Sequence, residues 1–171
     1  SDVASGRLED FESTDINILG KIYVLLNAFN STNKYDFMGG ALKDTLGITE
    51  NKVYTIGDKT YDVTVTFIDS DEAKFNVNGE VTNSLNVGET FKLSDGSQIG
   101  VTEVNYQDYA GGIQQVEFTL GANKLTIENG QEIEIDDEAV NDLRGYVTKN
   151  SASGGKEKIS NIVIEWKAED D

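Results

Sequence analysis

Three acidic side chains lie close together in the sequence, at Asp69, Asp71 and Glu72. Calcium binds about six to eight oxygen atoms, commonly from several carboxylates and backbone carbonyls. The cluster therefore supplies the residue types of a calcium site, although it lacks the spacing of an EF-hand loop. The alternative is a solvated acidic loop between two strands. Calcium is the only cofactor that the sequence suggests.

The residues that most often perform catalysis are missing from the chain, which contains no histidine and no cysteine. A Ser-His-Asp triad, a thiol nucleophile, a thiolate metal site and a disulfide are therefore excluded within it. Among 31 acidic residues, some pair meets the spacing of glycosidase carboxylates by chance. Nothing in the sequence marks such a pair as buried, so we predict no catalytic residue and no enzyme activity.

Aromatic residues suggest a contact surface. The stretch YQDYAGG at 106–112 places Tyr106 and Tyr109 beside two glycines, which predicts a loop where aromatic side chains serve contact with a glycan or a protein. Trp166 is in phase with Ile162 and Ile164. We therefore predict that it packs in the core, with a carbohydrate-stacking platform as the alternative.

The charge of the chain limits its partners. Asp and Glu number 31 against 14 Lys and Arg, so the formal net charge is −17. Nucleic acids and anionic membrane surfaces both repel such a polyanion. No stretch approaches the ~18 consecutive apolar residues of a membrane-spanning helix. We expect no nucleic-acid binding and no membrane span in this chain, whereas cations or a cationic partner suit its charge.

Alternating apolar and polar residues are the main structural signal, and they predict antiparallel strands with one solvated face. The clearest examples are at 60–69, 115–120 and 160–166. Turns of the type I′ class are expected between strands at three sites: Asn78-Gly79, Asp95-Gly96 and Asn129-Gly130.

Two stretches depart from simple alternation. Within 99–106 the apolar residues change face, which predicts a β-bulge near Thr102-Glu103. At 136–145, acidic residues followed by helically spaced apolar residues and Gly145 predict a helix of one or two turns. The flanking stretches 144–149 and 159–166 are expected to pair as antiparallel strands.

We therefore predict an all-β protein, mainly an antiparallel β-sandwich built from hairpins, with one or two short helical turns. It is treated as one all-β unit over 1–171, with two lobes as an alternative. Within it we expect N-terminal strands at 1–49, a central hairpin-rich domain at 50–136, and a helical turn followed by a C-terminal hairpin at 137–171.

Several segments of the chain, in order, resemble archaeal S-layer-like cell-surface proteins of the kind found in small-genome archaea. The most specific are GETFKLSDGSQIGV, YAGG and VEFTLGANKL. The resemblance implies an extracellular, glycosylated, structural β-domain, and Asn30 in Asn30-Ser31-Thr32 matches the acceptor tripeptide for N-glycosylation. Family members are usually longer and begin with a signal peptide, so we expect a fragment or a shortened relative.

The leading functional hypothesis is a cell-surface building block that assembles outside the cell with copies of itself or with other surface proteins, without catalysis. One alternative is an extracellular module that binds glycan or protein through Tyr106 and Tyr109. Another is a filament subunit that completes the sheet of a neighbour with a terminal strand.

Overall fold

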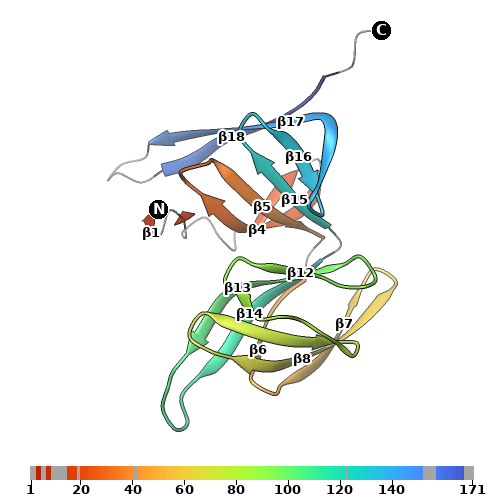
Figure 1. The fold of residues 1–171 in the computed structure, drawn as a ribbon, viewed down its shortest axis with the longest axis vertical. Coiled ribbons are helices and arrows are strands. Elements are labelled where there is room, and N and C mark those ends of the chain that lie inside the picture. The colour runs from red at the N-terminus through yellow and green to blue at the C-terminus, as the bar shows by residue number, and fades with distance from the viewer. Residues whose placement is uncertain are drawn as a thin grey trace. The chain divides into compact units, whose positions relative to one another are not determined.

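The protein is built from β-strands, as the sequence predicts. The structure, a computed structural model, describes residues 3–4, 7–8, 15–18, 20–40, 42–121, 123–151 and 157–167. Over these residues it contains antiparallel strands and turns but no helix. The chain divides into two compact units (Figure 1). We call residues 40–122 the central unit, and residues 1–39 with 123–171 the N/C unit.

The central unit is a sandwich of two sheets. One sheet has the order β10-β9-β8-β7, with β11 also paired to β9, and the other has the order β12-β13-β14-β6. The strands are β6 (Leu42–Gly47), β7 (Asn51–Ile56), β8 (Lys59–Ile68), β9 (Glu72–Val77), β10 (Glu80–Val81), β11 (Leu85–Asn86), β12 (Thr90–Lys92), β13 (Gln98–Tyr106) and β14 (Gln114–Gly121).

Backbone hydrogen bonds join the two sheets of the central unit where the chain passes from one to the other. After β6, the N–H of Thr49 donates to the carbonyl of Val65 at 2.9 Å, in the opposite sheet. After β11, the N–H of Gly88 donates to the carbonyl of Val101 at 2.7 Å. At both crossings the chain therefore extends the ladder of the sheet that it enters.

The core of the central unit lies between its two sheets. Phe118 contacts Tyr54 and Phe75, with ring centroids 5.9 and 5.3 Å apart. Alternation predicts most of this core. Within 60–69 it also predicts that Phe67 shares a buried face with Val65, but Phe67 is 38% exposed. A register shift between Val65 and Phe67 turns the later side chain outward.

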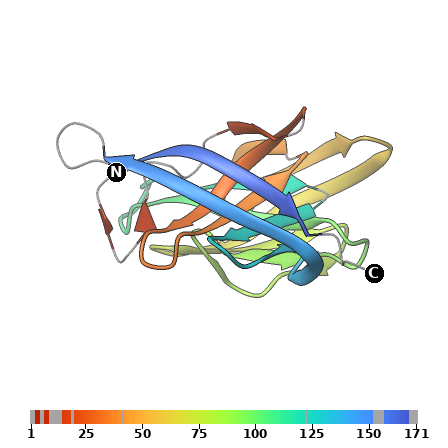
Figure 2. The same cartoon turned by 90° about the horizontal axis from the view of Figure 1, so that it is seen from above.

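The N/C unit contains one curled antiparallel sheet. Its order is β1-β2-β4-β5-β15-β16-β17-β18, and β3 also pairs with β4. Figure 2 shows β17 and β18 as a long two-stranded ribbon. The strands are β1 (Val3–Ala4), β2 (Arg7–Leu8), β3 (Asp15–Ile18), β4 (Lys21–Phe29), β5 (Lys34–Gly39), β15 (Asn123–Glu128), β16 (Glu132–Ile135), β17 (Glu138–Ser151) and β18 (Glu157–Trp166).

The helix expected at 136–145 is wrong, because these residues form a tight turn and the start of β17. Asp136 and Asp137 have φ values of 55° and 69°, and the turn they form joins the paired residues Ile135 and Glu138. Asp tolerates this left-handed backbone better than most residues. The Asp136 carboxylate also accepts a hydrogen bond from the backbone N–H of Lys124 at 2.7 Å. The acids therefore stabilise a hairpin rather than a helix N-terminus.

The two units differ from the division suggested by the sequence. The central region expected at 50–136 overlaps the central unit from residue 50 to 122, and residues 123–136 belong to the N/C unit. The N/C unit combines strands from both ends of the chain, because β15 pairs with β5 over Asn123–Glu128.

Candidate functional site

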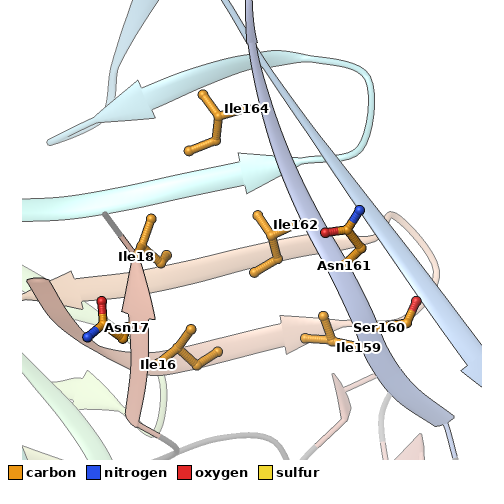
Figure 3. Close-up of a pocket in the computed structure, with 8 residues that line it drawn as sticks. All are labelled: Ile16, Asn17, Ile18, Ile159, Ser160, Asn161, Ile162 and Ile164. Atoms are coloured by element: carbon orange, nitrogen blue, oxygen red, sulfur yellow. The ribbon is translucent and has the colours of Figure 1, made fainter. Parts of the chain in front are cut away.

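A groove of about 630 Å³ lies between β3 and β18 in the N/C unit. Figure 3 shows the side chains of both strands beside this space. We call this groove the seam, and its lining residues are Ile16, Asn17, Ile18, Ile159, Ser160, Asn161, Ile162 and Ile164.

Both strands that border the seam are edge strands over the described residues. There, β3 pairs with β4 and β18 pairs with β17, and neither has a second neighbour in the sheet. Successive residues of an antiparallel strand direct their backbone groups alternately to the two sides. Each edge therefore presents N–H and C=O groups to the seam that another strand can pair with.

Over the described residues, the seam is the open side of the N/C unit's hydrophobic core. This core contains fully buried residues such as Tyr35, Phe37 and Ile127. The seam isoleucines, including Ile18 and Ile164, pack against the same core but are only half-buried. Completing their burial would be favourable, because removing apolar surface from water stabilises by about 25 cal/mol per Å².

A polar cluster at one end of β18 fixes that strand to the neighbouring hairpin. Lys149 on β17 forms an ion pair with Glu157 at 2.9 Å, and its Nζ donates to Oδ1 of Asn30. Burial raises the pKa of Tyr35 to about 12, and the Glu157 charge adds to the increase. Asn30, the predicted glycosylation residue, is half-buried in the β4–β5 turn with its amide oxygen engaged.

The three predicted calcium ligands each accept a hydrogen bond from a nearby serine. Asp69 accepts a hydrogen bond from the N–H of Ser70 at 2.7 Å. Asp71 accepts one from the hydroxyl of Ser70 at 3.1 Å. Glu72 instead accepts one from the hydroxyl of Ser84 at 3.1 Å. Within the described ranges, no group of three acidic side chains is placed to hold a metal ion. The calcium site stays a prediction.

The two residues of the predicted contact loop lie in different surroundings. Tyr106 ends β13 and packs partly against the core of the central unit. The Asp108 charge raises its pKa. Tyr109 lies in the β13–β14 connection, is 66% exposed, and donates its hydroxyl hydrogen to Gln107 Oε1 at 2.8 Å. Only Tyr109 therefore presents most of its ring to solvent.

The prediction that Trp166 packs in the core is wrong, because its side chain is 80% exposed. Alternation correctly places Ile162 and Ile164 against the core. Trp166 is the last residue of β18. It lines a shallow hollow with Tyr146 and Arg144.

Sequence reasoning did not identify the seam. The alternation in β18 is a signal for one border, and the short run Asp15–Ile18 is a weaker signal for the other. Neither pattern shows that the two strands line one groove, because that depends on the curl of the whole sheet.

Comparisons with known proteins identify no relative. No family model, no curated protein and no solved structure matches the chain. Over the residues that the structure describes, none forms a helix of the length and apolar character that crossing a membrane requires. The resemblance to archaeal S-layer-like proteins therefore stays a prediction.

Proposed function

We propose that the protein is a non-catalytic structural building block that assembles with neighbouring polypeptides, in the first instance copies of itself, through the seam of its N/C unit. The observation that supports this most strongly is that two edge strands, β3 and β18, border one groove with a half-buried apolar lining. Edge strands that expose apolar side chains are prone to pair with other chains. The cell-surface location suggested by the sequence fits such a role and belongs to the same proposal.

A binding module that uses the predicted contact loop is the second candidate function. The high exposure of Tyr109, together with Ile113 at 51%, favours it. It is the weaker candidate, because Tyr106 is partly packed in the core and the two tyrosines do not form one exposed surface.

Analytical ultracentrifugation over a range of protein concentrations tests the leading proposal. The unmodified protein should associate, and Ile164→Lys should shift it towards monomer because a lysine in the seam opposes burial of the groove. Ile22→Lys is the matched control, because Ile22 lies in the same unit but is 61% exposed and does not line the seam. Thermal melts followed by circular dichroism must show that both variants are folded.

A protein that stays monomeric at every concentration would contradict self-assembly. Equal association of Ile164→Lys and Ile22→Lys would place the contact elsewhere. Loss of association in Tyr109→Ala, with Ile164→Lys unaffected, would favour the contact loop instead.

A further inference from the structure

The directions of the strands limit what can occupy the seam. From β3 through β4, β5, β15, β16 and β17 to β18, every neighbouring pair is antiparallel. This path contains seven strands. Because the number of strands is odd, β3 and β18 run in the same direction. They could pair directly only as parallel strands, in a sheet that is otherwise antiparallel.

One additional strand would remove this mismatch. A strand running opposite to β3 also runs opposite to β18, so it can form antiparallel ladders with both edges at once. It would be the eighth strand of the path that runs from β3 to β18, beside which β1 and β2 also belong to the sheet. Barrels of about eight strands have an interior that side chains can fill completely, which is what a half-covered core requires.

We infer that the seam binds a single extended segment of another polypeptide, running antiparallel to both β3 and β18, with apolar side chains at alternate positions. This inference rests on the proposed function and specifies its partner. The segment's inward side chains would meet Ile18, Ile162 and Ile164, which line the groove. In Figure 3 these three side chains extend into the space between the two strands.

Length and charge further define the segment. At about 3.3 Å per residue, β3 spans about 13 Å and β18 about 33 Å, so a segment of about five to ten residues can pair with both. The chain carries a formal net charge of −17. Outward-facing side chains that are neutral or basic would therefore be favoured over acidic ones.

The chain itself continues the strand ladders where it crosses between the two sheets of the central unit, at Thr49–Val65 and Gly88–Val101. No corresponding bond connects β3 with β18 over the described residues of the N/C unit. Over these residues, both edges of the seam are therefore available to a strand from outside.

A synthetic peptide tests the inference on the intact protein. The probe is a peptide of about nine residues with valine at every second position and threonine or lysine between the valines. Its control is an isomer of the same composition with the valines adjacent. The alternating peptide should quench or shift the fluorescence of Trp166, the only tryptophan, and slow amide hydrogen exchange in β3 and β18. Ile164→Lys should weaken binding by more than about tenfold, and Ile22→Lys should not.

Cross-linking decides the direction of the bound peptide. The chain has no cysteine, so a cysteine placed at either end of β18 is unique. Lys158→Cys and Glu165→Cys both replace exposed residues. An alternating peptide with a C-terminal cysteine should form a disulfide faster with Lys158→Cys, because antiparallel pairing places its C-terminus near the start of β18.

Three results would overturn the inference. The first is faster cross-linking of the peptide to Glu165→Cys than to Lys158→Cys, and the second is equal affinity for the alternating peptide and for its isomer with adjacent valines. The third is a self-associated form in which the β18 strands of two copies pair symmetrically. The proposed function fails separately. If Ile164→Lys prevents self-association but no peptide binds, assembly through the seam stands and the single-strand inference falls. If the peptide binds in the stated direction but the protein is always monomeric, the inference stands and self-assembly falls.

Discussion

Polar side chains connect separate strands of this protein, and Asp95 is a clear example. Asp95 accepts hydrogen bonds from Lys59 Nζ and the Tyr61 hydroxyl, each at 3.0 Å, and from the N–H of Ser97 at 3.0 Å. Burial alone would raise the pKa of Asp95, but these hydrogen bonds outweigh it and lower the pKa. The carboxylate therefore fixes the β12–β13 turn to β8, a structural role that explains its shifted pKa.

Tyr35 provides a test of the N/C core. Its side chain is fully buried, and its hydroxyl has no hydrogen-bond partner among the described residues. Such an unpaired group costs about 1–3 kcal/mol. Tyr35→Phe should therefore raise the free energy of unfolding by about 1 kcal/mol. Urea unfolding followed by circular dichroism measures this, with hydrogen exchange in β5 assigning the change to the N/C unit.

The same variant should alter the response to alkali. The pKa of Tyr35 is raised to about 12 in the folded protein, against about 10 in the unfolded chain. The unfolded state therefore loses its proton first, and stability falls as the pH rises from 10 towards 12. Tyr35→Phe should lose less stability over this range.

Tyr54→Phe is the control for the stability of Tyr35→Phe at neutral pH. It should lower the free energy of unfolding, because the Tyr54 hydroxyl donates to Asp44 at 2.9 Å. Lower stability in Tyr35→Phe would show that its hydroxyl is satisfied.

Local pattern was sufficient to predict many strands and some of their irregularities. The phase change in 99–106 predicts the bulge that the structure shows between Val101 and Glu103. Asn78 and Gly79 both have positive φ, as a type I′ turn requires. At Asn129-Gly130 only the glycine does, so the hairpin is confirmed but its turn type is not. Asp136-Asp137 was missed because acidic residues suit both a helix start and a tight turn.

The seam could not be predicted from local pattern, because its two borders lie at opposite ends of the sequence and meet only through the curl of seven strands. Residue type is the basis for predicting Asp69 as a calcium ligand and Tyr106 as a contact residue. The structure places each among its own local partners. The order of the strands in the whole sheet determines where the described core of the N/C unit is left open. Alternation of apolar and polar residues does not encode that order.

Gly145 in β17 tests the packing of the ribbon on the core. A Cβ at this position would collide with the side chain of Ile127 and lie 3.3 Å from Ile133. Gly145→Ala should therefore lower the stability of the N/C unit by about 1–3 kcal/mol. Gly47→Ala is the strand control, because its nearest new contact is an ordinary 3.5 Å from Glu50. Thermal melts compare the two, and equal midpoints would show that the ribbon can shift without cost.

At the level of the whole molecule, one chain combines a two-sheet sandwich with a curled sheet whose described strands leave one side open. Each unit has its own hydrophobic core, so the contact that we propose at the seam would involve only the core of the N/C unit. That separation suits a building block, in which one part provides a stable body and the other forms contacts.

Salt should strengthen association rather than weaken it. Two copies with a formal net charge of −17 each repel one another, whereas the seam that we propose as their contact is apolar. Raising the ionic strength from about 0.01 to 0.15 M shortens the Debye length from about 30 to 8 Å. The screened copies should therefore associate more tightly in sedimentation experiments. Association measured in magnesium and in calcium at equal ionic strength separates general screening from specific calcium binding. Screening affects association equally in both ions, whereas a specific calcium site makes association stronger in calcium. Association that weakens steadily with salt would instead indicate a contact built on ion pairs and would contradict assembly through the seam.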